Sequence, residues 1–183
     1  ALAEFNNLGE EADLKTRGTM LDEGLQVVNG LWSGKPFSFV GEHYTVKDAH
    51  FLPATLQQPR IPVWVGGKWP NRAPFRRAAQ WDGVFPILSG TDTESYPTQI
   101  REMMHFLLDH RESNDQFDVT VQGTTPGNDS MHAAEVVAEY AEAGVTWWQE
   151  ASNGHRRELM GGAGKTSCIE AVRWRIQQGP PRI

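Results

Sequence analysis

The spacing of hydrophobic residues changes several times along the 183-residue chain, and each change predicts a new element. Between Met20 and Trp32 apolar residues recur at helical spacing, which predicts a helix with one apolar stripe that ends at Ser33-Gly34. From Pro36 to Val46 apolar residues alternate weakly around Gly41, as is typical of a hairpin. This part of the chain is therefore predicted to form a helix followed by a hairpin.

Four later segments are short, apolar and rich in β-branched or aromatic residues, which is typical of buried strands in a parallel sheet. They are Ile61–Val65, which stops at Gly66-Gly67, then Gly83–Ile87, Phe117–Val121 and Val145–Gln149. Helical patterns follow each of them: Phe75–Trp81, a helix opened by the capping box Thr91–Glu94, a helix from Asp129 or Ser130 to Ala143, and a last helix opened by the capping box Ser167–Glu170. Strict β-α alternation predicts a parallel sheet covered by helices. The pattern alone fits both a doubly wound open sheet and a segment of a barrel.

Composition narrows the class of protein. The net charge of −6 disfavours nucleic acid as a main partner, because phosphate binding needs clustered positive charge. One cysteine, Cys168, excludes an internal disulfide and makes the cytoplasm the expected compartment. No apolar stretch is long enough to span a bilayer, so no membrane partner is expected. The start at Ala1 lacks an initiator Met and the features of a signal peptide, and we interpret it as a cut inside a longer protein.

Several segments, in order along the chain, resemble luciferase-like monooxygenases. They are RGTMLDEGLQVVNGLWSGKPFSFVGEHYTV (Arg17–Val46), QQPRIPVWVGG (Gln57–Gly67), PFRRAAQWDGVFP (Pro74–Pro86), AGVTWWQE (Ala143–Glu150) and GPPR (Gly179–Arg182). The LWSG segment and the pair PRIPVWVGG and RRAAQWDGVFP are the more specific parts of this resemblance.

The resemblance implies an α/β protein with the (β/α)8 TIM-barrel fold that binds FMN or the deazaflavin coenzyme F420. By this resemblance, residues 1–183 are the C-terminal part of a single barrel domain and contain its fourth helix and its strands five to eight. The first four strands lie upstream. A complete barrel needs about 250 residues, so this chain is short. Because an incomplete barrel exposes strand edges and its apolar interior, we expect the fragment alone to be inactive.

The strongest candidate site is the loop after the strand that ends at Gly66-Gly67. Barrel active sites lie at this end of the strands, and glycines let a ligand approach the backbone. A helix N-terminus and basic side chains favour an anion there. The resemblance implies that this loop holds the phosphate or ribityl side of the cofactor, and the predicted cofactor-binding residues are Gly66, Gly67, Lys68, Asn71 and Arg72. The alternative is a tight turn with surface charges.

Other motifs carry weaker hypotheses. One of Trp147 and Trp148 is expected to face the barrel interior and the other the helices, because successive strand residues alternate. Glu150 could orient a ligand, but we favour a salt bridge that closes the barrel. The loop Gly161–Thr166 ends like a Walker A motif without its first glycine, and we interpret it as a loop over the barrel mouth. His155 in the same region could contact an anion or be solvated.

No convincing catalytic acid, base or metal-ligand spacing is present in the sequence. That agrees with a family in which the flavin ring carries out the redox chemistry and the protein shapes the pocket. The preferred hypothesis is a flavin- or F420-dependent oxidoreductase or monooxygenase acting on a small organic substrate, and a homodimer is expected. The alternatives are a non-catalytic relative that binds a cofactor or builds a subunit interface, and an open-sheet enzyme acting on phosphate sugars.

Overall fold

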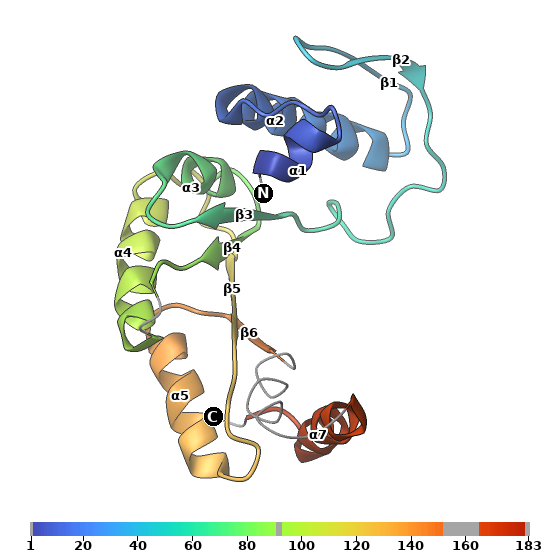
Figure 1. Cartoon of the computed structure of the whole chain (residues 1–183). Helices are drawn as coiled ribbons and strands as arrows, with labels where there is room; N and C mark the ends of the chain where they lie inside the picture. Colours follow the sequence, from blue (N-terminus) through green and yellow to red (C-terminus); the bar gives the residue numbers. More distant parts are fainter. Residues whose placement is uncertain (1, 91–92, 152–164, 182–183) are drawn as a thin grey trace. The chain divides into compact units, whose positions relative to one another are not determined.

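The computed structural model describes residues 2–90, 93–151 and 165–181 and divides the chain into two compact units (Figure 1). The first unit is Ala1–Pro62 and the second is Val63–Ile183. Each unit is described by itself below.

The first unit contains two helices and a hairpin. They are α1 (Leu2–Asn7), α2 (Leu14–Trp32), β1 (Phe37–Val40) and β2 (Thr45–Ala49), with β1 and β2 antiparallel. The predicted helix and hairpin are confirmed, but α2 begins six residues before Met20. The reason is Asp13, whose carboxylate accepts a hydrogen bond from the backbone N–H three residues on and so caps the helix.

Glu23 of α2 holds the turn of the hairpin. Its carboxylate accepts hydrogen bonds from the backbone N–H groups of Glu42, His43 and Tyr44, at 2.7, 2.9 and 3.0 Å. Desolvation raises the pKa of Glu23, but the bonds from these N–H groups outweigh it and the net pKa lies below its ordinary value of 4.5. The hairpin is thereby tied to α2 by an ionised side chain.

We expect this attachment to depend on pH. A pKa lowered in the folded state means that the stabilisation is present above the unfolded value and is lost as pH falls through the folded value. The protection factors of the Glu42, His43 and Tyr44 amides, that is, their exchange rates corrected for the intrinsic pH dependence, should therefore fall on acidification below about pH 4.5. Glu23→Gln should show fast exchange already at neutral pH. Protection factors in the parent that are the same at neutral and acidic pH would contradict the assignment.

The second unit is built on a four-stranded parallel sheet in the order β3-β4-β5-β6. The strands are β3 (Trp64–Lys68), β4 (Gly83–Ile87), β5 (Asp118–Gly123) and β6 (Trp147–Glu150). The helices that connect and follow them are α3 (Arg72–Ala78), the 3-10 turn η1 (Thr93–Ser95), α4 (Tyr96–Leu108), α5 (Ser130–Glu142) and α7 (Lys165–Gln178). The predicted parallel α/β arrangement is confirmed.

Helices α3, α4 and α5 lie along one side of this sheet (Figure 1). The residues buried between helices and sheet include Val65, Val84 and Val119 of the strands, and Phe75, Ile100, Met103 and Leu107 of the helices. The opposite side, which we call the open face, carries Trp64, Phe85, Ile87 and Trp147 in register. Three of these remain solvent-exposed, at 37% for Trp64, 60% for Ile87 and 53% for Trp147. Large apolar side chains in solvent on one face are unusual for a parallel sheet, since such sheets are normally covered on both faces.

Several predicted boundaries were wrong. Strand β3 begins at Trp64 rather than Ile61 and continues through Gly66 and Gly67 to Lys68, because its ladder with β4 extends to the pair Lys68 and Ile87. Helix α4 starts at Tyr96 after the turn η1, and Thr91 and Asp92 of the predicted capping box lie outside the described residues. Helix α7 likewise begins at Lys165, before the predicted cap at Ser167. Helix α7 ends at Gln178, and Gly179 follows it with a φ of 75°, a conformation that favours glycine.

Candidate functional site

The end of β3 presents two predicted site residues on the open face. Side chains alternate along a strand, and the register places Gly66 and Lys68 on the same face as Phe85 and Ile87. A Cβ at Gly66 would meet nothing nearer than a backbone oxygen at 3.8 Å, so the backbone is bare and accessible there. Gly66 and Lys68 are therefore placed where a ligand on the open face could meet a free backbone and an amine.

Gly67 faces the other way, toward helix α3. A Cβ at this position would lie 2.4 Å from the Cβ of Pro74, which real atoms cannot tolerate. Glycine at this position is thus explained by the packing of α3 on the sheet. Gly67 therefore does not lie on the open face with Gly66 and Lys68.

The loop that follows uses two of its backbone amides internally. The Trp69 N–H donates to the carbonyl of Ile87 at 2.9 Å, and the Asn71 N–H donates to the carbonyl of Lys68 at 3.0 Å. Asn71 occupies the N-cap position of α3, but its side chain makes no capping hydrogen bond. An anion at this loop would therefore not be held by the amides of Trp69 or Asn71.

Arg72, the first residue of α3, stacks on aromatic rings. Its guanidinium carbon lies 4.5 Å from the centroid of Trp69 and 4.5 Å from that of Phe106 in α4. Trp69 is only 2% exposed and packs edge-on against Phe75. The Arg72 side chain is thus held against the helices, whereas Lys68 lies on the open face.

The neighbouring loop after β4 is also fixed, by residues that the sequence did not single out. The Ser89 hydroxyl donates to the carbonyl of Trp69, and Gln99 of α4 bonds both the N–H of Ser89, at 3.1 Å, and its carbonyl, at 2.9 Å. The available signal was position, because Ser89 lies two residues after the end of β4, at the edge of the sheet where Lys68 ends β3. The two loops therefore form one hydrogen-bonded rim.

The two tryptophans of β6 point to opposite faces, as expected. Trp147 lies on the open face, where its ring is 5.8 Å from that of Trp64. The Trp64 indole N–H in turn donates to Asp118 at 3.1 Å. Trp148 lies on the helix side, where its ring meets Tyr140 of α5 edge-on at 5.1 Å. The alternation predicted from the sequence is confirmed.

Glu150, at the end of β6, makes the ion pair that we favoured over a ligand contact. Its Oε2 lies 3.2 Å from Nη2 of Arg175 in α7, and both side chains are largely buried. The carboxylate also accepts bonds from the Thr125 N–H and hydroxyl, each at 2.8 Å, and from the Trp148 indole at 3.0 Å. This network joins the end of β6, the loop after β5 and helix α7.

The remaining sequence hypotheses concern His155, the loop Gly161–Thr166, metal binding and membrane-spanning segments. His155 and the glycines of the loop Gly161–Thr166 lie outside the described residues. Within the described ranges, no group of three or more His, Cys, Asp or Glu is placed to hold a metal ion. Nor does any helix in the described part of the chain have the length and apolar character needed to cross a membrane.

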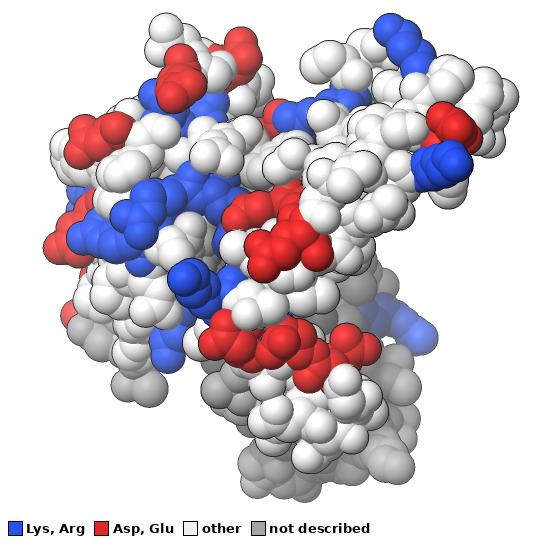
Figure 2. Space-filling model, turned by 90° about the horizontal axis from the view of Figure 1, so that it is seen from above, with Lys and Arg blue, Asp and Glu red and all other residues white. Residues whose placement is uncertain are grey.

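Charge on the face seen in Figure 2 is mixed, with basic and acidic side chains both present. The whole chain likewise has 17 Lys and Arg against 23 Asp and Glu. The chain as a whole is therefore negatively charged, and binding of an anion depends on where basic side chains such as Lys68 lie.

Comparison with known proteins shows which family this chain resembles and which proteins are similar to it. A family model for luciferase-like monooxygenases matches residues 1–177. Uncharacterised proteins of Mycobacterium tuberculosis and Mycobacterium bovis are 42% identical over 67 residues, which are 37% of this chain and 22% of each relative. An F420-dependent glucose-6-phosphate dehydrogenase of Microbacterium testaceum is 30% identical over 80 residues, 44% of this chain and 23% of that protein. The aligned segments thus span less than a quarter of each relative's length.

Proposed function

Because the chain belongs to the luciferase-like monooxygenase family, we propose that it is the C-terminal part of a flavin- or F420-dependent oxidoreductase with a (β/α)8 barrel. In this proposal residues 1–183 belong to one barrel domain and β3 to β6 are its strands five to eight. The substrate is a small organic molecule. The upstream strands complete the cylinder, and the chain by itself is inactive.

The open face of the sheet is the observation that carries the proposal. Trp64, Ile87 and Trp147 are large apolar side chains that stay exposed on it, whereas the other face is packed against α3, α4 and α5. Leaving such residues exposed loses about 25 cal/mol of stabilisation for each Å² of apolar surface that could be buried. In a closed barrel the same residues line the interior, where side chains from several strands fill the space.

The cofactor is proposed to bind with its anionic end at the C-terminal end of β3. The residues there fit such a group: Gly66 leaves a bare backbone surface, and Lys68 supplies a positive charge on the same face. Gly67, Asn71 and Arg72 complete the proposed set. Gly67 allows α3 to pack closely behind the strand, and Arg72 adds charge beside the loop.

Either FMN or F420 would supply the electron- or hydride-transferring ring. The chain's own residues bind and orient it: Lys68 fixes the charged tail, and the Ser89 and Gln99 contacts keep the adjoining rim in place. The name of the Microbacterium relative supports F420, and the family description, luciferase-like monooxygenase, supports a reaction with oxygen. Absorption spectra of the purified full-length protein would distinguish the two cofactors.

Lys68→Ala in the full-length protein tests this site. Removing a charge-assisted hydrogen bond to the cofactor should raise its Kd at least about tenfold, because such bonds contribute about 1.5–3 kcal/mol. Fluorescence titration with FMN and with F420 measures the effect. Arg76→Ala is the matched control, since it removes an exposed charge from α3 and should leave the Kd unchanged. Equal Kd values for the parent and Lys68→Ala would remove Lys68 from the site.

A non-catalytic relative that binds the cofactor or builds a subunit interface is the second candidate. No catalytic acid or base stands out among the described residues, which suits both candidates because the ring performs the redox step. Turnover of the reduced cofactor by full-length protein supports an enzyme, and tight binding without turnover supports the alternative.

A further inference from the structure

The open face of the sheet is covered near the starts of its strands. A Cβ at Gly83 would lie 2.6 Å from the ring of Trp64, so the Trp64 side chain lies over this glycine. The ring of Trp147 is 5.8 Å from that of Trp64. Thr120, in register with Trp147, is completely buried. Side chains of the chain itself therefore fill this half of the face, and a ligand can reach the sheet more easily near the strand ends.

Near the strand ends the open face carries two glutamines, which we call the glutamine pair. Gln122 of β5 is in register with Gln149 of β6, and alternation along each strand places both on the face that carries Thr120. Both side chains are exposed. Each lies one residue before the end of its strand, at the same edge of the sheet as Lys68. The glutamine pair is therefore accessible from the edge where the cofactor is proposed to bind.

Most hydrogen-bonding groups of the glutamine pair are unused. The amide nitrogen of Gln149 donates to the Thr120 hydroxyl at 3.1 Å, which holds this side chain in place. Its carbonyl oxygen, and the whole side-chain amide of Gln122, have no partner in the described part of the chain. A glutamine amide both donates and accepts hydrogen bonds. Because neighbouring strands are about 4.8 Å apart, the pair presents donors and acceptors side by side.

The glutamine pair is uncharged, and so are most of its neighbours. Among the described residues of β5 and β6, Asp118 is the one charged residue on the open face, and it accepts the indole N–H of Trp64 at 3.1 Å. Lys68 is three strands away from Gln149, about 14 Å along the sheet. An anion at the glutamine pair would thus be desolvated beside no cation of the sheet, which is costly. A neutral ligand that both donates and accepts fits the pair better.

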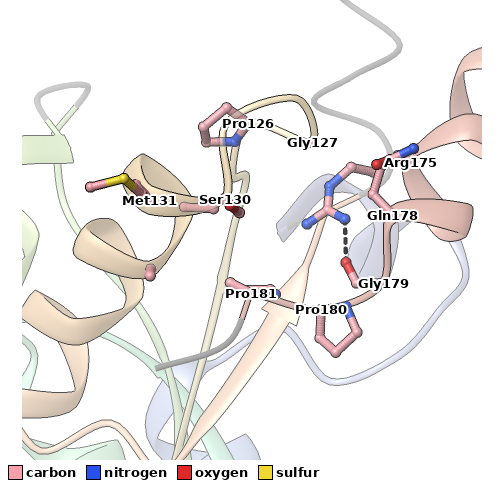
Figure 3. A pocket seen from close by; sticks show the side chains of 11 residues that line it. Pro126, Gly127, Ser130, Met131, Arg175, Gln178, Gly179, Pro180 and Pro181 are labelled. Carbon is pink, nitrogen blue, oxygen red and sulfur yellow. Dashed lines mark hydrogen bonds between the residues drawn. The ribbon is translucent and has the colours of Figure 1, made fainter.

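A cavity between the first turn of α5 and the end of α7 offers a ligand less (Figure 3). Its wall is largely made of proline, glycine and other small or apolar residues. Arg175, which lines it, is only 5% exposed and is already paired with Glu150. The charge of Arg175 is therefore not available to a ligand, and the glutamine pair is the stronger candidate.

From these observations we infer that Gln122 and Gln149 bind the substrate, and that the substrate is a neutral molecule with a carboxamide or lactam group. The inference rests on the proposed oxidoreductase function. The N–H of the substrate donates to one glutamine carbonyl, and its C=O accepts from the amide nitrogen of the other glutamine. The apolar body of the substrate lies toward Phe85 and Ile87 of β4, between the glutamine pair and Lys68.

Calorimetric titration of the full-length protein with benzamide as a probe tests the inference. Benzamide should bind saturably and at least about tenfold more tightly than acetophenone, which has a similar shape and the same C=O but lacks the N–H. A site that pairs with an N–H rejects an analogue without it, because a glutamine carbonyl is then left unpaired. Sodium benzoate should also bind at least about tenfold more weakly than benzamide, because its charge meets no cation at the pair.

The decisive variant is Gln122→Leu, which keeps a side chain of similar size and removes its hydrogen bonds. Since the Gln122 side chain has no partner in the described part of the chain, the fold should be kept. Benzamide should bind at least about tenfold more weakly, and its advantage over acetophenone should disappear. The matched control is Gln80→Leu, the same change at an exposed glutamine after α3, which should leave both affinities unchanged.

Fluorescence titration of the same variant with FMN and with F420 separates this inference from the proposed function. The Kd of the cofactor should be unchanged in Gln122→Leu, whereas Lys68→Ala should raise it without changing benzamide binding. An imide edge of the cofactor ring has the same chemistry as a lactam, so a raised cofactor Kd in Gln122→Leu would assign the pair to the cofactor and overturn the inference. Unchanged benzamide binding in Gln122→Leu, or benzoate bound as tightly as benzamide, would overturn it too.

Discussion

Gly67→Ala should destabilise the protein by about 1–3 kcal/mol, the usual cost of forcing an extra methyl group into a packed core. The added Cβ would lie 2.4 Å from the Pro74 Cβ, and Pro74 belongs to a helix whose Phe75 and Ala78 are fully buried. Neither the strand nor the helix can shift without opening this core. Urea unfolding of the full-length protein would measure the loss as a lower midpoint at unchanged slope.

Gly66→Ala is the matched control for this prediction. Its Cβ would meet the Phe85 carbonyl at an ordinary 3.8 Å, so stability should change little. Because the methyl group points to the open face, we expect it to weaken cofactor binding instead. The two adjacent glycines thus have opposite expected effects. Equal destabilisation by both substitutions would contradict the assignment of their faces.

Glu150→Gln should cost about 3 kcal/mol of stability, because it leaves Arg175 charged and buried without its ion partner. The side chains of Arg175 and Glu150 are 7% and 20% exposed, so solvent replaces the lost partner poorly. The amide also cannot accept all of the bonds that Thr125 and Trp148 now donate to the carboxylate. Urea unfolding of the full-length variant provides the measurement.

The control for this pair is the surface contact between His132 and Glu135. These side chains are 60% and 73% exposed, and exposed pairs contribute little. Glu135→Gln should therefore leave the unfolding midpoint nearly unchanged. If Glu150→Gln proved as mild as Glu135→Gln, the Glu150 network would not be the connection between β6 and α7 that the structure indicates.

The order of helices and strands could be predicted from the sequence, because the spacing of apolar residues and the positions of turn residues depend only on neighbouring residues. Strand β4 was predicted with both ends correct. The start of α4 was missed because a 3-10 turn intervened after the predicted cap. The extension of β3 through two glycines was missed because pairing with β4, a tertiary contact, outweighed the low strand propensity of glycine.

The candidate site was less predictable than the fold. The sequence predicted Gly66, Gly67, Lys68, Asn71 and Arg72 as one set, but it could not show that Gly67 faces α3 or that Arg72 stacks on Trp69 and Phe106. Phe106 lies 34 residues after Arg72 in the sequence, and only the packing of α4 beside α3 brings them together. The sequence also could not predict how Arg175 is bonded, because its contacts, and the lack of a partner for its Nε in the described part of the chain, depend on three separate segments.

A crystal structure of the full-length protein with its cofactor bound tests the central claim most directly. We predict that Trp64, Phe85 and Trp147 face the inside of a closed cylinder of parallel strands. The charged end of the cofactor should lie within hydrogen-bond distance of the Lys68 amine, against the bare backbone of Gly66. An open sheet with helices packed over both faces, or a cofactor anchored away from the end of β3, would contradict the account.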